Sequence, residues 1–243
     1  MATVSLWLVG ALFVASLLVG KWQANQQKMK WRQVAQAMGG SYVETTWTSQ
    51  VIIPLHAGTV TLDTFTSTSR ATSPASTTYT RLRMPLVVHQ EFEFVLMNRN
   101  AANQLLMQTM QSRTGELATS RNTKAEESLR LLMLGEVLLG NDDFDTSFIL
   151  KSAQEMQARK LFAMVKDQLI RRNEFDLFLH PHRDVSASAG ATTKILHYQE
   201  KGVVSDVTHL REVCKLLQSI AQELQHSGIA SDQKAQVTSP LAL

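Results

Sequence analysis

The chain has 243 residues, a formal net charge of +3 at pH 7 and a single cysteine. Hydrophobic residues make up 44% and charged residues 19%, which is the composition of an ordinary folded protein and not of a disordered one. One cysteine excludes an intrachain disulfide and any site built on a cysteine pair, and it fits a reducing compartment. Nucleic-acid binding is disfavoured, because basic and aromatic residues are not interleaved.

An uncharged apolar run, VSLWLVGALFVASLLVG, occupies residues 4–20, and no charged side chain precedes Lys21. At about 1.5 Å per residue, a helix of this length approaches the roughly 30 Å hydrocarbon core of a bilayer. Apolar residues surround the whole cylinder, which is rare for a buried soluble helix. The basic start and cleavage site of a signal peptide are missing. The sequence therefore predicts one transmembrane helix over residues 1–20.

Basic residues lie on one side of this run. None precedes it, and four follow it: Lys21, Lys28, Lys30 and Arg32. The positive-inside rule then places the N-terminus outside and the rest of the chain in the cytoplasm, as a single-pass protein of the cell membrane. These four cations are candidate contacts for anionic lipid head groups. Trp7 and Trp22 are candidate anchors at the two interfaces of the lipid bilayer.

Residues 21–40 predict a basic juxtamembrane amphipathic helix that ends at Gly39 and Gly40. Its apolar face carries Trp31, Val34, Ala35 and Met38. From residue 41 the hydrophobic period changes to two, and β-branched and aromatic residues predict strands at 41–47, 58–65, 79–88 and 92–97. Pro85 indicates an edge position or a bulge in its strand. Residues 67–78 form a polar loop.

Residues 112–127 predict a linker between a β-rich subdomain at 41–111 and an α+β subdomain at 128–228. The second subdomain contains predicted strands at 144–150, 175–180 and 192–199. A helix is expected to start at Ser152, with Glu155 completing a capping box, and a last helix is capped by Ser205. Residues 229–243 lack periodicity and predict a disordered tail.

The fold class expected from these elements is α+β. It comprises an N-terminal transmembrane helix followed by a soluble module of antiparallel strands and amphipathic helices, and a division into two similar halves is left open.

Several short motifs resemble a bacterial family of uncharacterised function. They are Trp31 with Val34-Ala35, the stretches IPLHAGTVTLD at 53–63 and TYTRLR at 78–83, and GNDDFDTSFILK at 140–151. The resemblance covers residues 30–225 and implies an N-terminal membrane helix followed by an α+β domain, but no reaction. One departure is Asn141, where the family tends to have Asp.

The most specific positions of that resemblance are Phe144, Asp145 and Phe148, for which the residues themselves indicate a structural role. Phe144 and Phe148 are expected in the core, with Asp145 facing away or closing a turn.

Three further candidates carry possible chemistry. His180 and His182 share a face of an extended chain, as two ligands of one metal would, but Val185 stands where a related hydrolase motif has a third histidine. Arg81 and Arg83 share a strand face, where they are expected to be solvated or paired with acids and could grip an anion. Cys214 lies on the apolar stripe of the last helix, which favours a buried hydrophobe over a nucleophile.

The sequence contains no phosphate-binding loop, dinucleotide fingerprint or nucleophile elbow. The expected function is therefore that of a noncatalytic binding or scaffold module without cofactor or metal, an accessory subunit of a larger membrane complex. Trp47 and Tyr79 are candidate docking residues. The alternatives are a metal-dependent hydrolase using His180 and His182, and a sensor of anionic lipid surfaces.

Overall fold

The computed structural model describes residues 25–44, 49–68, 76–88, 91–103, 130, 133–172, 174–181 and 192–231. These residues form one sheet of eight strands, in which every neighbouring pair is antiparallel. The order across the sheet is β1-β2-β3-β4-β8-β7-β5-β6. The strands are β1 (Ser41–Glu44), β2 (Ser49–Leu55), β3 (Gly58–Thr68), β4 (Ser76–Val88), β5 (Phe94–Asn98), β6 (Phe148–Ser152), β7 (Phe175–Pro181) and β8 (Thr192–Lys201).

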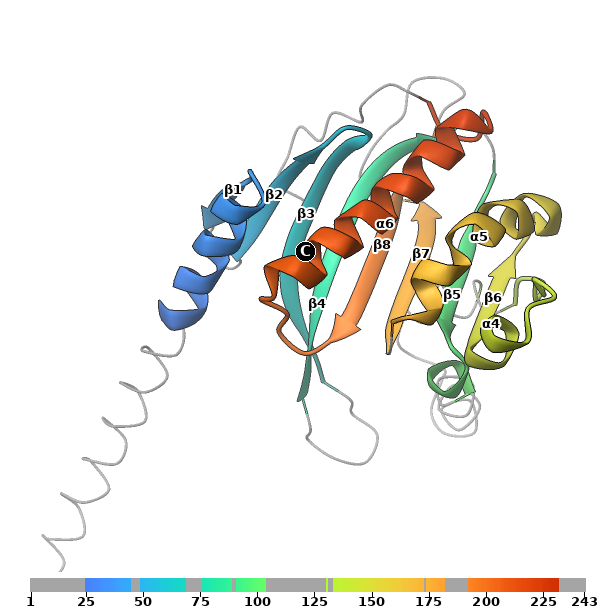
Figure 1. Cartoon of the computed structure of the whole chain (residues 1–243), viewed down its shortest axis with the longest axis horizontal. Coiled ribbons are helices and arrows are strands. Elements are labelled where there is room, and N and C mark those ends of the chain that lie inside the picture. The colour runs from blue at the N-terminus through green and yellow to red at the C-terminus, as the bar shows by residue number, and fades with distance from the viewer. Residues whose placement is uncertain are drawn as a thin grey trace, which may run out of the picture.

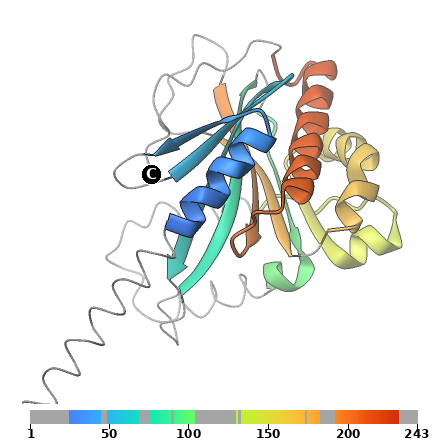
Figure 2. The ribbon, with the colours of Figure 1, turned by 60° about the vertical axis from the view of Figure 1, so that its left-hand side comes forward.

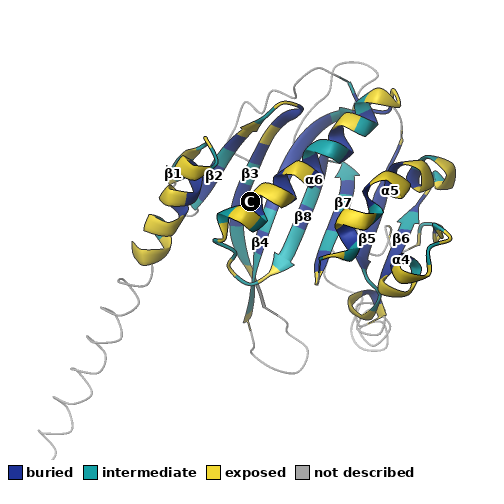
Figure 3. Ribbon diagram, viewed as in Figure 1, coloured by how far each residue is buried: buried dark blue, intermediate teal, exposed yellow. Residues whose placement is uncertain are grey.

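The long helices cover one face of this sheet (Figures 1 and 2). Helix α6 (Val207–His226) crosses the middle strands, α5 (Glu155–Ile170) covers β7 and β5, and helix 25–37 lies over the β1–β2 end. The short helix α4 (Asp142–Ser147) leads directly into β6. Figure 3 shows the exposed residues of these helices on the side away from the sheet. The fold is therefore a two-layer arrangement of helices on an antiparallel sheet.

One row of paired residues runs across six strands on the helix-covered face. In register order it is Leu62, Leu82, Tyr198, Leu177, Leu96 and Leu150. Each of these side chains is at most 1% exposed. Since side chains alternate between the two faces of a strand, this row determines which residues of every central strand face the helices.

The helices bury the stripes that their sequences predict. Leu161, Phe162, Val165 and Leu169 of α5 are buried, as are Leu210, Val213, Cys214, Leu217, Ala221 and Leu224 of α6. The ring of Phe162 meets that of Phe94 edge-on, with 4.9 Å between centroids. Edge-to-face pairs of this kind add to the stabilisation from burial alone.

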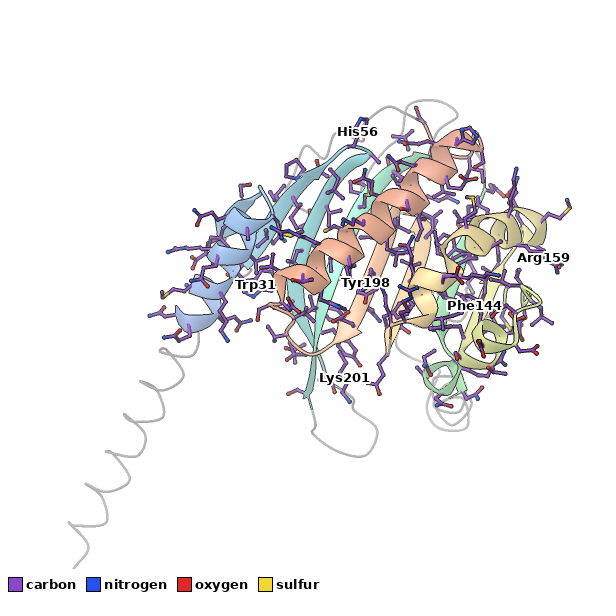
Figure 4. The ribbon with its side chains drawn as sticks, viewed as in Figure 1. Trp31, His56, Phe144, Arg159, Tyr198 and Lys201 are labelled. Atoms are coloured by element: carbon purple, nitrogen blue, oxygen red, sulfur yellow. The ribbon has the colours of Figure 1, made fainter. Side chains whose placement is uncertain are left out.

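Helix 25–37 docks on the sheet through Trp31, which is buried between the helix and the strands behind it (Figure 4). The predicted stop at Gly39 and Gly40 is confirmed. Gly39 has a positive φ of 67°, and a Cβ on Gly40 would lie 2.4 Å from the carbonyl oxygen of Ile52. The chain therefore turns closely against β2 only because glycine occupies this position.

Several predicted elements need correction. The two halves do not form separate units of the fold, because strands from both predicted subdomains alternate in one sheet and β4 pairs directly with β8. Strand β2 is an addition to the predicted elements. The segment 144–147, expected as strand, is mostly helical because Asn141 caps α4 by accepting a hydrogen bond from the backbone N–H of Phe144. The predicted linker at 112–127 lies outside the described residues.

The predicted helix caps also differ. Helix α5 starts at Glu155 after Gln154, which makes no side-chain cap. The Ser152 hydroxyl donates to the carbonyl oxygen of Glu93 and accepts from the backbone N–H of Gln154. Asp206, and not Ser205, caps α6. The start of the predicted tail packs on the fold, since Ile229 is buried and the N–H of Ser231 donates to the Val87 carbonyl oxygen.

Pro85 lies in a central strand, and not in an edge strand. Its strand β4 pairs with β8 along its length, whereas the β3 ladder reaches only as far as Arg83. Pro85 thus falls beyond the β3 ladder, where a missing N–H is tolerated.

The prediction of a single-pass membrane protein is contradicted. Among the residues that the structure describes, no helix is long and apolar enough to cross a membrane. Even the longest of them, α6, carries charged residues such as Arg211, Glu212 and Lys215 on its exposed side. Residues 1–20, to which the sequence assigns the transmembrane helix, lie outside the described residues.

Removing the Phe162 ring tests the packing of α5 on the sheet. Phe162→Ala is expected to lower the free energy of unfolding by about 3–5 kcal/mol, because the cavity left at a fully buried aromatic is only partly refilled. Met164 lies on the same helix and is 54% exposed. Met164→Ala should therefore change the free energy of unfolding by less than about 0.5 kcal/mol. Urea unfolding of both variants measures the difference, and equal effects would contradict this packing.

Candidate binding site on the second face of the sheet

The sheet face opposite the long helices, called here the second face, carries a polar half and an apolar half. Two adjacent register rows show the change. The first row consists of Asp63, Arg81, Gln199, Asp176, Met97 and Ile149. The second row consists of Thr61, Arg83, His197, Phe178, Val95 and Lys151. Over β5 and β6, Val95, Met97 and Ile149 form a small core with Ala102. Asp63 lies on β3 and Arg81 and Arg83 lie on β4, whereas Asp176 on β7 and Lys151 on β6 stand apart from them.

Asp63 is the centre of the polar half. Its Oδ1 accepts from Arg81 Nε and its Oδ2 from Arg81 Nη2, both at 2.8 Å, in a bidentate pair. Arg83 Nη2 donates to the same Oδ2 at 2.5 Å. Asp63 is 1% and Arg83 7% exposed. Two guanidinium groups therefore share one buried carboxylate, and the group of Asp63, Arg81, Arg83 and His197 is called the Asp63 cluster below.

An aromatic pair borders the cluster on β3 and β4. The rings of Phe65 and Tyr79 stack with 5.3 Å between centroids, and the guanidinium carbon of Arg81 lies 4.9 Å from the Phe65 ring centre. Arg81 is thus held between a carboxylate and an aromatic face, which fixes its position and part of its stem. Both rings are half-buried.

Two nitrogen atoms of the cluster are buried without a hydrogen-bond partner among the described residues. They are Arg83 Nε and His197 Nε2. Buried donors and acceptors are normally paired, so two unpaired nitrogen atoms in one cluster are unusual. Arg83 and His197 are directly opposite each other on β4 and β8, which places both unpaired atoms in the same part of the second face.

The pKa values of Arg83 and His197 are both shifted, and burial is the main cause at each residue. Burial lowers the pKa of Arg83, and the nearby Arg81 lowers it further against the effect of Asp63. Burial also holds the pKa of His197 well below its usual range, and His180, Arg81 and Arg83 act in the same sense. The imidazole is therefore neutral at pH 7, and its surroundings disfavour more positive charge.

The other carboxylate on this face compensates little. Asp176 lies two strands from Arg81, at about 10 Å by strand spacing, and its Oδ2 accepts from Gln199 Nε2 at 2.8 Å. Burial raises the pKa of Asp176. Among the described residues, the two arginines against Asp63 leave one positive charge without a carboxylate beside it, and this arrangement suits an incoming oxyanion.

Sequence reasoning identified part of this site. The shared face of Arg81 and Arg83, and their pairing with an acid, are confirmed. It missed Asp63 and His197. The alternation of apolar and polar residues around Leu62 and Thr64 indicated which face of the strand Asp63 occupies. It did not indicate which strand lies beside it. His197 sits in an apolar strand, ILHY, and only its neighbours give it a role.

The structure describes three of the predicted lipid-contact residues. Lys28 forms an ion pair with Glu44, and the Arg32 guanidinium lies over the Tyr42 ring at 5.3 Å, whereas Lys30 is exposed. Lys21, Trp7 and Trp22 lie outside the described residues, as does Trp47.

The predicted histidine pair is not brought together with other ligands in the described part of the chain. His180 is the next-to-last residue of β7. Its Nδ1 lies 3.1 Å from the Pro181 carbonyl oxygen, and its ring centroid lies 6.0 Å from that of His197. His182 lies outside the described residues. Within those residues, no group of three or more His, Cys, Asp or Glu side chains could hold a metal.

The segment at 140–151 has the structural role that its sequence indicates. Phe144 and Phe148 are buried and lie 5.3 Å apart between ring centroids. Asp145 closes the turn before them, since its two oxygens accept from the backbone N–H groups of Leu139 and Asn141. Arg99 donates to the carbonyl oxygen of Asp145 and ties the turn to the end of β5.

A second polar group lies on the helix-covered face near the start of α6. The Tyr198 hydroxyl donates to Glu200 Oε2 at 2.5 Å, and His209 Nε2 lies 2.8 Å from the same oxygen. Figure 4 shows Tyr198 on the side of β8 that α6 covers. This group carries its own carboxylate and joins α6 to β8.

Comparisons with protein-family models, with curated proteins and with solved structures find no match for the chain. The resemblance seen in the sequence therefore stays a prediction.

Removing the charge of Asp63 tests whether it stabilises the cluster. Asp63→Asn is expected to cost about 3–5 kcal/mol of unfolding free energy, because it leaves two partly buried guanidinium groups without a counter-charge. Glu155→Gln breaks an exposed pair with Arg159 and should cost less than about 1 kcal/mol. Chemical unfolding measures both, and a neutral Asp63→Asn would show that the cluster is solvated.

Cys214 offers a test of burial under α6. The side chain is 2% exposed, and burial raises the pKa of its thiol to about 12. Because the thiolate is the reactive form, the folded protein should react with a thiol reagent at pH 8 only at the rate at which it opens. In urea the same cysteine should react at once. Rapid modification of the folded chain would contradict this position.

Proposed function

We propose that the protein is a noncatalytic binding module, an accessory or scaffold subunit, that binds an acidic segment of a partner protein on the second face of its sheet. One observation carries the proposal: two guanidinium groups share a single buried carboxylate at Asp63, so that one positive charge has no counter-charge nearby in the part of the chain that the structure describes.

The kind of partner follows from what surrounds the cluster. Phe65, Tyr79 and Phe178 are half-buried beside it, and they offer apolar contact area next to the positive charge. Arginine and aromatic side chains are the groups that most often anchor protein partners. A peptide with carboxylates spaced among apolar residues matches both features, whereas a uniformly charged polymer would use only the first.

The charge of Arg81 provides the test. A fluorescent peptide with glutamate among leucine residues should bind the full-length chain, and its glutamine counterpart should bind at least tenfold more weakly. Arg81→Gln leaves the cluster neutral, with Arg83 against Asp63, and should also weaken binding about tenfold, within the range of one charged hydrogen bond. Fluorescence anisotropy at fixed ionic strength gives both values.

Arg159→Gln is the matched control, since it removes one charge from the outer side of α5 (Figure 4). Binding by this variant should equal that of the wild type. If the glutamine peptide binds as well as the glutamate peptide, or if Arg81→Gln has no more effect than Arg159→Gln, the proposal is wrong.

A further inference from the structure

We infer that Arg83 Nε and His197 Nε2 together form a seat for one oxyanion. This inference rests on the proposed function, because the oxyanion bound between the two residues would be a carboxylate of the acidic partner. Carboxylate and sulfate share the chemistry that the seat recognises: a negative oxygen that accepts from an N–H group on each side.

The placement of the two residues is set by the sheet. Arg83 and His197 are a direct cross-strand pair on the second face, and Cβ atoms of such pairs lie about 4.5–5.5 Å apart. Both strands are central, with β3 beyond Arg83 and β7 beyond His197. The backbone therefore holds the pair at a nearly constant separation whether or not a ligand is bound.

The guanidinium of Arg83 is only partly used. Its Nη2 donates to Asp63, while its Nε is buried without a partner among the described residues. Arg81, in contrast, uses its Nε and Nη2 on the same carboxylate. An N–H group that is buried, charged and unpaired is unfavourable, and an oxyanion at Nε would satisfy it.

The imidazole of His197 supplies the second contact. Its ring lies between Arg83 on β4 and Phe178 on β7, with 5.6 Å to the Phe178 ring centre. The charged and titratable groups around it are Arg81 and Arg83 on β4, Asp63 on β3, and Asp176 and His180 on β7. In its Nε2–H form the neutral ring donates to an oxyanion, and when protonated it donates more strongly.

Other buried cations in the described part of the chain already have an acid beside them. Lys194 Nζ lies 3.3 Å from Glu93 Oε1 and donates to the Phe92 carbonyl oxygen. Arg172 Nη2 lies 3.5 Å from Glu212 Oε2, although Arg172 Nε and Nη1 are buried without a hydrogen-bond partner among the described residues. An added anion would be repelled there. The Asp63 cluster is the place where cations outnumber the carboxylate that they share.

Sulfate is the probe, because it stays dianionic throughout the pH range of histidine. Added to the full-length chain at constant ionic strength, it should shift the His197 side-chain signals in nuclear magnetic resonance spectra in a saturable way. A bound anion raises the pKa of His197, so binding takes up a proton and sulfate affinity should rise as the pH falls from 8 towards 5. Saturable sulfate binding that leaves the His197 signals unshifted would count against His197 as a contact.

Two variants locate the seat. His197→Phe keeps a ring but removes both nitrogens, and Arg83→Lys keeps the charge but removes the Nε–H group. Each should weaken sulfate binding at least tenfold by calorimetry. His56→Phe, in the exposed turn after β2 (Figure 4), removes an imidazole elsewhere and should leave binding unchanged. Should Arg83→Lys fail to fold, His197→Phe decides alone. Unchanged sulfate binding in His197→Phe overturns the seat.

Competition separates this inference from the proposed function. If sulfate binds at His197 and displaces the glutamate peptide, both stand. If sulfate binds there but the peptide does not compete, the seat stands and the proposed partner is wrong. If the peptide binds equally to the wild type, His197→Phe and Arg83→Lys, the partner stands and the seat is overturned. If neither ligand binds, both are wrong.

Discussion

The structure depends on the register of one row of side chains. Leu62, Leu82, Tyr198 and Leu177, with Leu96 and Leu150 beyond them, are paired across six strands and buried beneath α5 and α6. A slip of one residue in any of these strands would turn its apolar side chains away from the helices. The same register brings the neighbouring residues, among them Asp63 and Arg83, to the second face. Hydrophobic burial on one side thus determines the polar arrangement on the other.

Strand β8 joins the two ends of the chain into this one sheet. It lies between β4 and β7, so residues near position 197 meet residues near position 83, and α6 then returns across the strands that β8 has joined. Arg211 of α6 even donates to the Ala37 carbonyl oxygen at the end of helix 25–37. Because no half can bury its apolar face without the other, the fold is expected to behave as one cooperative unit.

The Asp63 cluster is a costly element for a structural core alone. Buried ion pairs recover their desolvation penalty only with good geometry and satisfied donors, and here two nitrogen atoms are unsatisfied within the described residues. The apolar half of the second face, with Val95, Met97 and Ile149, shows that this sheet can be closed by packing instead. A binding role accounts for the cluster of charges at the β3–β4 end of the face, whereas Lys151 at the β6 end stands beside apolar side chains.

The sequence by itself determined the local elements that have strong periodicity. Strands β3, β4, β7 and β8 and the buried stripes of α5 and α6 follow from periods of two and 3.6, and Arg81 and Arg83 had to share a face because they are two residues apart. Only the tertiary structure decided the strand order, which placed β8 beside β4 and so brought His197 to Arg83 and Asp63 to both arginines. The tertiary structure likewise decided how Ser152 is used, since its hydroxyl joins the start of α5 to the carbonyl oxygen of Glu93. Pairing between distant strands depends on the burial of whole faces, which no short stretch of sequence contains.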